Sequence, residues 1–232
     1  MPEPKNDISR FHNKHKGETC LLVGNGPNLL KTPPEEFDYL SIGSNTIFWY
    51  DGCALRNHGG WRPTYYVAVD SCIMRDYWDD LCRYDDIPKF VPTPNLDKWS
   101  RPNFYRFYHR PGPLWPRCGR TLWPSNLLDE TGITFSNVMH VQMQLAHFMG
   151  FTTMLIIGME HGKHGRAHFW GWHDPMPDET PPEWLEGYKI LREGMGATML
   201  NLSIDTCVPE SIIPRDDWKK WTRDAKKTRE PL

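Results

Sequence analysis

The sequence predicts an α/β fold, a single Rossmann-like domain whose mostly parallel sheet carries helices on both faces and a long irregular insertion. One observation is that short apolar runs alternate along the chain with segments of helical pattern, as in strands joined by crossover helices. Another is that the first apolar run ends in the turn Gly24-Asn25-Gly26-Pro27. Such a turn is typical of a strand that passes through a loop into a helix.

The composition indicates one soluble globular domain. The chain has 232 residues, of which 39% are hydrophobic and 24% charged, and its net charge is −2. These values exclude a disordered chain and a basic protein that coats nucleic acid over its whole surface. Six scattered cysteines without a C-x-x-C pair favour reduced thiols. Because no apolar run reaches the roughly 18 residues of a membrane span and no signal peptide is visible, we expect a cytoplasmic protein.

Six segments read as strands, and three as helices, after a flexible polar lead-in predicted over residues 1–18. The domain is expected over residues 19–232. The predicted strands are Thr19–Val23, Tyr39–Asn45, Thr64–Asp70, a short Lys89–Pro92, Thr153–Ile157 and Ala197–Leu202. The predicted helices are Ser136–Phe151, Pro182–Glu193 and Asp216–Lys227, with Ser136 as an N-cap and Gly150 as a helix stop. Residues 95–131 are expected to form the irregular insertion.

Polar residues follow the ends of several predicted strands. They are Asn25, Asn45, Asp70, Glu160 and Ser203. Ligands of open α/β sheets bind at the carboxyl ends of the strands. The sequence therefore predicts a binding site at this edge of the sheet.

The turn after the first strand has two interpretations. Its glycines allow close approach of a ligand to the backbone, and the helix start offers N–H groups to a phosphate. Leu29 stands where a dinucleotide fingerprint needs glycine, and a P-loop needs G-K-[S/T], so neither motif is present. The alternative is a tight turn in front of a helix that Pro27 begins.

The loop over residues 160–182 contains four histidines, His161, His164, His168 and His173. With Lys163 and Arg166 it could neutralise a phosphate, supply a general base or bind a metal. Metal binding by His161, His164 and His168 with Glu160 needs a helix, which Gly162 and Gly165 disfavour. The glycines are typical of a lid that closes on a substrate. A solvated loop with surface histidines is the remaining alternative.

The predicted insertion mixes basic and aromatic residues. Residues 97–123 contain six Lys or Arg, one acidic residue and seven aromatic residues. Such a mixture suits single-stranded nucleic acid or a sugar phosphate. The alternative is that the aromatic residues form core and the arginines are solvated.

Five segments resemble a group of related known families. TCLLVGNGPNLL followed by YLSIGSNTIF resembles the opening of the bacterial lipooligosaccharide sialyltransferases. It equally resembles the motility-associated glycosyltransferases and the related archaeal 6-hydroxymethylpterin diphosphokinases. ITFSNVMHVQMQLAHFMGFTTMLIIGME is similar to the second family block, and HFWGWH to the segment with the catalytic histidine. NLSIDTCVPESIIPRDDW resembles the closing block of the motility-associated group.

The resemblance implies a nucleotide-binding α/β domain that uses a CMP-sugar without a metal. It implies donor and nucleotide contacts by Gly24, Asn25, Gly26, Asn45, Asp70, Ser136, Asn137, Gly158 and Glu160. It implies that His173 is the general base on the acceptor hydroxyl, with His168 as the second candidate. Where the sialyltransferases keep tyrosines for the leaving phosphate, this chain has His161, Lys163, His164 and Arg166, which we expect to take that role.

The predicted function is therefore that of a metal-independent, sialyltransferase-like glycosyltransferase. Its acceptor, a glycan, a protein or a nucleic acid, is expected along Arg106, Tyr108, Arg110 and Trp115. A homo-oligomer is left open. One alternative is a pyrophosphokinase of the hydroxymethylpterin type, which needs ATP and Mg²⁺ near a carboxylate pair, here Asp70 and Glu160. Another is a non-catalytic module that binds nucleotide or nucleic acid.

Overall fold

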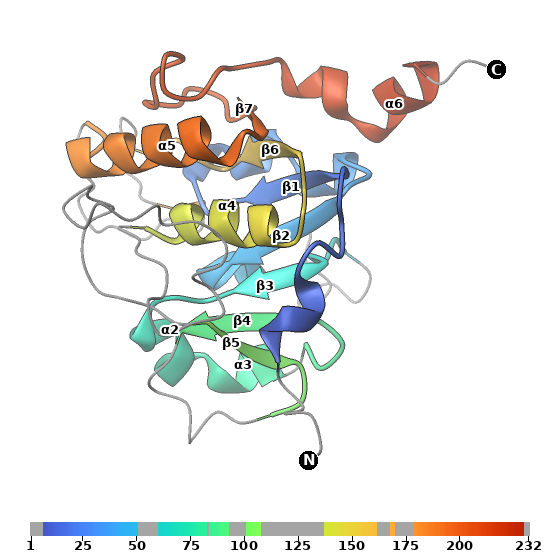
Figure 1. Cartoon of the computed structure of the whole chain (residues 1–232), viewed down its shortest axis with the longest axis vertical. Coiled ribbons are helices and arrows are strands. Elements are labelled where there is room, and N and C mark those ends of the chain that lie inside the picture. The colour runs from blue at the N-terminus through green and yellow to red at the C-terminus, as the bar shows by residue number, and fades with distance from the viewer. Residues whose placement is uncertain are drawn as a thin grey trace.

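The computed structural model describes residues 7–50, 60–82, 84–92, 101–107, 137–161, 168–169 and 179–229. These residues form a seven-stranded sheet of order β5-β4-β3-β2-β1-β6-β7, in which every pair of neighbours is parallel (Figure 1). The strands are β1 Thr19–Val23, β2 Leu40–Ser44, β3 Tyr65–Val67, β4 Lys89–Pro92, β5 Phe104–Phe107, β6 Thr153–Ile157 and β7 Thr198–Asn201. The predicted α/β fold with a parallel sheet is confirmed.

Strand β5 corrects the prediction of an irregular insertion over residues 95–131. It pairs with β4 in the register Lys89 with Phe104, and it buries Phe104, Tyr105 and Phe107. Aromatic residues favour strands because they pack well on a pleated surface. A four-residue strand gives too little alternation to be recognised among prolines and arginines. Residues 108–131 of the predicted insertion lie outside the described part of the chain.

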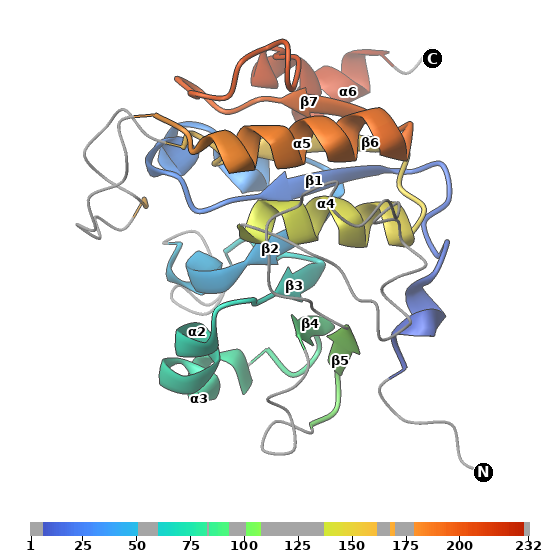
Figure 2. The same cartoon turned by 60° about the vertical axis from the view of Figure 1, so that its left-hand side comes forward.

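The sheet is covered on both faces. Helix α4 (Val138–Phe148) packs across β1, β2 and β3, with α5 (Pro182–Met195) beside it (Figure 2). The opposite face packs against η2 (Pro27–Lys31), η4 (Asn45–Trp49), α2 (Ser71–Asp76) and α3 (Trp78–Cys82). Successive residues of β1 alternate between the two apolar clusters, with Leu22 in one and Leu21 in the other.

The predicted helices differ from the observed ones at the start of α4 and in the C-terminal segment, apart from shifts of two or three residues at the ends of α4 and α5. Asn137, not Ser136, is the N-cap of α4, and its Oδ1 accepts the backbone N–H of His140 at 3.2 Å. Ser136 itself lies outside the described residues. The predicted helix over 216–227 is two pieces, η7 (Trp218–Trp221) and α6 (Arg223–Arg229), because Thr222 between them is extended, with ψ 162°. The remaining short helices are η1 (Ile8–Phe11) and η3 (Pro34–Glu36).

Residues 7–18 correct the prediction of a flexible lead-in. Phe11 of η1 is only 2% exposed and meets Tyr105 edge to face at 4.7 Å between ring centroids. His15 Nε2 lies 2.6 Å from the Tyr65 hydroxyl. The reason is that Ile8 and Phe11 give this polar segment a small apolar face. Residues 1–6 lie outside the described part.

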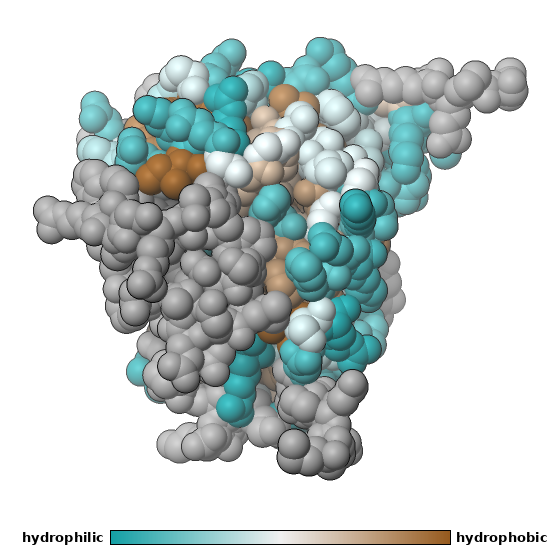
Figure 3. Space-filling model, viewed as in Figure 1, coloured by the Kyte–Doolittle hydropathy of each residue, from teal (hydrophilic) through white to brown (hydrophobic). Residues whose placement is uncertain are grey.

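The described surface is largely hydrophilic on the face shown in Figure 3, where hydrophobic colour occurs only in small separate areas. Among the described residues one large hydrophobic side chain, Leu30, is exposed, at 56%. No helix in the part of the chain that the structure describes is long and apolar enough to cross a membrane.

Candidate functional site

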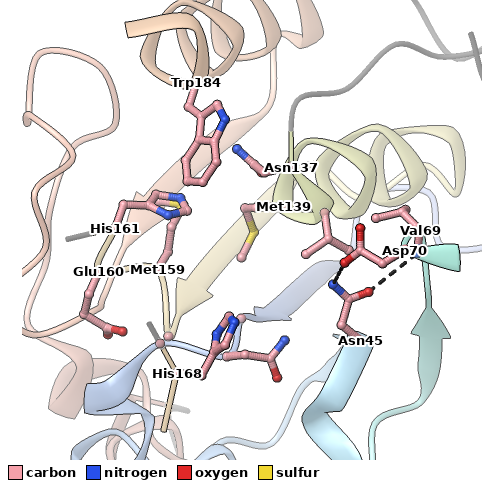
Figure 4. Close-up of a pocket in the computed structure, with 15 residues that line it drawn as sticks. Asn45, Val69, Asp70, Asn137, Met139, Met159, Glu160, His161, His168 and Trp184 are labelled. Atoms are coloured by element: carbon pink, nitrogen blue, oxygen red, sulfur yellow. Dashed lines mark hydrogen bonds between the residues drawn. The ribbon is translucent and has the colours of Figure 1, made fainter. Parts of the chain in front are cut away.

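A pocket of about 320 Å³ opens where the carboxyl ends of β1, β2 and β6 meet the start of α4 (Figure 4). Strand β1 lies between β2 and β6, so the strand order reverses here, which is where open α/β sheets bind ligands. The lining residues are Gly24, Asn25, Gly26, Asn45, Val69, Asp70, Asn137, Val138, Met139, Gly158, Met159, Glu160, His161, His168 and Trp184.

The structure brings together most of the predicted donor-site residues. Gly24, Asn25, Gly26, Asn45, Asp70, Asn137, Gly158 and Glu160 all line the pocket, together with His161 and His168. The predicted residues Ser136, Lys163, His164, Arg166, His173, Tyr108, Arg110 and Trp115 lie outside the described residues. Arg106 lies on β5 and does not line the pocket. Four strand spacings separate β5 from β1, about 19 Å at the usual strand separation.

The glycines of the first turn allow two loops to pack closely. A Cβ on Gly24 would lie 2.3 Å from the carbonyl oxygen of Gly158. A Cβ on Gly26 would lie 1.5 Å from Oε2 of Glu160. Gly158 itself has a φ of 67°, which favours glycine. Gly158 and Glu160, which follow β6, therefore occupy these two Cβ positions, where the sequence predicts an approaching ligand.

Glu160 is fully buried beside Gly26. Neither carboxyl oxygen has a hydrogen-bond partner among the described residues. Burial raises the pKa of Glu160 to about 8. The backbone N–H groups of Asn28 and of Glu160 itself oppose that rise more weakly, since they lie near the carboxyl group without the geometry of a full hydrogen bond. The predicted carboxylate is therefore largely a neutral carboxylic acid at pH 7, which can donate one hydrogen bond as well as accept others.

Two asparagines connect neighbouring strands at the pocket. Asn25 Nδ2 donates to the carbonyl of Ser44 at 3.0 Å, and its buried Oδ1 has no partner among the described residues. Asn45 has a left-handed φ of 46°, and its Nδ2 donates to Asp70 Oδ2 at 2.9 Å. Its Oδ1 accepts the backbone N–H of Val69 at 3.5 Å, as the dashed lines in Figure 4 show. Burial raises the pKa of Asp70 despite this contact.

The opposite side of the pocket carries a hydrogen-bonded chain that the sequence did not reveal. The Tyr188 hydroxyl donates to Asn137 Oδ1 at 3.1 Å and lies 2.5 Å from His161 Nε2. Burial lowers the pKa of His161 to about 4 and that of the neighbouring His140 to about 3. His161 is therefore neutral at pH 7. It cannot supply the positive charge predicted for the leaving phosphate, because burial disfavours the imidazolium.

His168 and Phe169 form a short described segment that is anchored beside the pocket. The backbone N–H of Phe169 donates to the carbonyl of Asn25 at 3.0 Å. The Phe169 ring meets Tyr50 edge to face, with 5.8 Å between ring centroids. These contacts place His168 among the lining residues. Of the two predicted bases, His168 is the one whose position the structure describes.

The described lining residues include no lysine or arginine. Among the described residues no three His, Cys, Asp or Glu side chains converge as metal ligands would. The polar character of the described pocket comes from asparagine amides, the carboxyl groups of Asp70 and Glu160, and imidazoles. Such groups bind a ligand by hydrogen bonds.

Comparisons of the sequence with protein-family models and with curated proteins find no match. Solved structures do match. The sialyltransferase CstII from Campylobacter jejuni, in complex with cytidine-5'-monophosphate, aligns with a TM-score of 0.54 at 10% identity, over 88% of this chain and 86% of that one. The monofunctional α-2,3-sialyltransferase Cst-I from the same organism aligns with 0.55 at 15% identity, over 87% and 81%.

CstII with a trisaccharide acceptor and CMP also aligns, with a TM-score of 0.51 at 11% identity over 84% of this chain and 85% of that one. At this level of identity the likeness concerns the fold. The seven-stranded parallel sheet of this chain therefore has the fold of the Campylobacter sialyltransferases.

Proposed function

We propose that the protein is a glycosyltransferase that takes a CMP-sugar donor and works without a metal ion. The observation that carries this proposal is the pocket at the strand-order reversal. It gathers Asn25, Asn45, Asn137, Glu160 and His168 from five separate segments of the chain. The shared fold adds support, since the neighbours were solved with CMP and with an acceptor trisaccharide.

Several buried polar groups at this pocket have no hydrogen-bond partner among the described residues. Asn25 Oδ1, Asn137 Nδ2 and both Glu160 oxygens are buried and lack partners among the described residues. Buried polar groups are nearly always hydrogen-bonded, because leaving one unpaired costs about 1–3 kcal/mol. A ligand with both donors and acceptors, such as a cytidine nucleotide, would satisfy them.

In the proposed arrangement the nucleoside lies near Gly158 and Glu160. A cytosine edge presents an amino donor beside a ring acceptor, which a neutral carboxylic acid complements. The phosphate lies near the turn of Gly24, Asn25 and Gly26. Lys163, His164 and Arg166 remain candidates to balance its charge, since they follow the pocket residue His161 in sequence.

The proposed reaction is a direct displacement. His173 or His168 accepts the proton of an acceptor hydroxyl while that oxygen attacks the anomeric carbon. The bond from the anomeric carbon to the phosphate oxygen breaks, and CMP leaves. His168 has support from its place in the pocket, and His173 from the resemblance to HFWGWH. We propose a glycan or protein acceptor and a cytoplasmic location on the sequence arguments alone.

A thermal-shift screen tests the proposal. The full chain is heated with CMP, CDP, UDP, GDP, ADP and ATP, each with and without Mg²⁺. A ligand at 100 times its Kd adds about 2.7 kcal/mol of apparent stability. We expect stabilisation by CMP that does not depend on Mg²⁺. Stabilisation by ATP only in the presence of Mg²⁺ would replace the proposal with a pyrophosphokinase, and no shift with any nucleotide would refute both.

A further inference from the structure

A chain of hydrogen bonds runs through the side of the pocket formed by α4 and α5, and its geometry assigns the donor and the acceptor of each bond. Asn137 Oδ1 accepts the backbone N–H of His140 at 3.2 Å, which fixes the orientation of the amide. The Tyr188 hydroxyl must therefore donate its single hydrogen to the same oxygen, at 3.1 Å. With that hydrogen committed, the hydroxyl can only accept at its other contact.

The other contact of the Tyr188 hydroxyl is His161 Nε2, at 2.5 Å. His161 must then donate from Nε2, so its proton is on Nε2 and its Nδ1 carries a lone pair. Burial keeps the ring neutral, since the pKa of His161 is lowered to about 4. The structure gives Nδ1 no hydrogen bond to a described residue, and His161 lines the pocket (Figure 4).

The ring is also held in place mechanically. It stacks on Tyr188 with 5.6 Å between ring centroids and an interplanar angle of 24°, and it meets Trp184 at 5.0 Å. The backbone of His161 adopts a left-handed φ of 51°, and its carbonyl accepts the Thr180 hydroxyl at 3.1 Å. A residue kept in a sparsely populated backbone region needs such surrounding contacts. The imidazole is thus fixed in position and in protonation.

We propose that His161 is a hydrogen-bond acceptor for a hydroxyl of the bound nucleotide sugar, with Tyr188 and Asn137 as its positioning residues. This inference rests on the proposed function for the ligand and replaces the expected contact of His161 with the leaving phosphate. A phosphate oxygen is itself an acceptor, so the lone pair of Nδ1 would repel it. A sugar hydroxyl can donate to Nδ1.

The first test is independent of any ligand. The protein is labelled with ¹⁵N-histidine, and two-bond ¹H–¹⁵N correlation spectra are recorded from pH 5.5 to 8. The His161 signals are assigned by their loss in His161→Asn. We expect a neutral ring with the proton on Nε2 throughout this range. A ring protonated on Nδ1, or an imidazolium at pH 7, would overturn the proposal.

The Tyr188→Phe variant tests the positioning role. Removal of the hydroxyl leaves Nε2 without its acceptor, so we expect mixed tautomers of His161 or a titration within the same range. Trp184→Phe is the matched control, since it changes a ring contact and no side-chain hydrogen bond of His161, and it should keep the wild-type tautomer. Equal spectra in wild type and a folded Tyr188→Phe would refute the positioning role. If Tyr188→Phe does not fold, the wild-type tautomer still decides.

The ligand is tested with a CMP-sugar by calorimetry. His161→Asn keeps an acceptor near the place of Nδ1 and should bind within about threefold of wild type. His161→Lys offers only donors and a positive charge and should bind at least about tenfold more weakly. Tighter binding by His161→Lys would show a phosphate contact and overturn the proposal. No CMP-sugar binding by the wild type would refute the proposed function, while the spectrum would still decide the tautomer.

Discussion

The two sides of the pocket use their polar groups in opposite ways. On the side of α4 and α5, the oxygen of Asn137, the hydroxyl of Tyr188 and Nε2 of His161 are committed to one another. On the side of β1 and β6, Asn25 Oδ1 and both oxygens of Glu160 are buried without partners among the described residues. The first set of atoms is already paired, whereas the second set, to which Asn137 Nδ2 also belongs, is left for the ligand of the proposed function. The difference lies between atoms and not between residues, since Asn137 and His161 each have one paired atom and one atom without a hydrogen bond to a described residue.

The largest loss of stability is expected at Gly24 and Gly26, where the loop after β1 touches the loop after β6. Gly24→Ala places a Cβ 2.3 Å from a backbone oxygen, so we expect a loss of about 3 kcal/mol or more in unfolding free energy. A Cβ in Gly26→Ala would meet the Glu160 side chain at 1.5 Å and the backbone oxygen of Gly158 at 2.8 Å. Because the nearer obstacle is a side chain that can shift, we expect a cost of about 1–3 kcal/mol. Urea denaturation measures both losses.

Two further variants serve as controls for the glycine series. Glu160→Ala should recover part of the loss in Gly26→Ala and none of the loss in Gly24→Ala. Gly43→Ala, whose nearest contact is the Ile47 side chain at 3.0 Å, should cost less than Gly24→Ala. Equal losses of stability at all three glycines would show that the close contact between the two loops does not set the cost of a Cβ.

The protonation of Glu160 gives the next effect. Its pKa is about 8 in the folded protein against an ordinary value of 4.5, so the folded state holds one more proton than the unfolded state between these values. Stability must then fall by a few kcal/mol as the pH rises from about 4.5 to about 8. Glu160→Gln should remove this fall, as denaturation curves at pH 5, 6, 7 and 8 would show. An unchanged pH dependence would place the titrating group elsewhere.

The two side-chain atoms of Asn137 can be tested separately. Its Oδ1 accepts two hydrogen bonds, whereas its Nδ2 has no partner among the described residues. Asn137→Asp keeps the acceptor for the His140 N–H but loses the Nδ2 donor, so CMP affinity should fall about tenfold while stability stays close to wild type. Asn137→Ala should lose about 1 kcal/mol of stability as well, because the helix cap is lost. Calorimetry and urea denaturation distinguish the two. An unchanged CMP affinity in Asn137→Asp would show that Nδ2 of Asn137 does not contact the nucleotide.

The smallest effect on stability is expected at Phe169, which anchors the segment that carries His168. Phe169→Ala removes the ring contact with Tyr50 and should loosen the placement of His168, so kcat/KM with a CMP-sugar should fall about tenfold. Stability should change by less than about 1 kcal/mol, because the ring is only partly buried. Leu30→Ala, at an exposed side chain, is the control and should leave kcat/KM unchanged. A normal rate in Phe169→Ala would mean that His168 needs no anchor.

Much of the fold could be predicted because fully apolar runs such as Thr153–Ile157 indicate buried parallel strands. The pocket followed from one rule, that polar residues after such strands meet at one edge. The burial of His161 could not be predicted, since it depends on contacts with Tyr188 and Trp184, which belong to a helix later in the chain. Likewise, spacing alone could not show that Glu160 fills the space beside Gly26.

The place of β1 in the middle of the sheet has a consequence for how the protein is made. Among the described strands β1 is synthesised before the others, yet one of its two neighbours, β6, is synthesised only after β2, β3, β4 and β5. Residues 13–17 likewise hydrogen-bond to Phe148, Met149 and Gly150, at the end of α4. Pairings between such distant parts of a chain form slowly. The close contacts of Gly24 and Gly26 with Gly158 and Glu160 therefore form only after β6 has been synthesised, and until then β1 lacks one of its two neighbours. An unpaired strand edge of this kind is a site at which chains can associate.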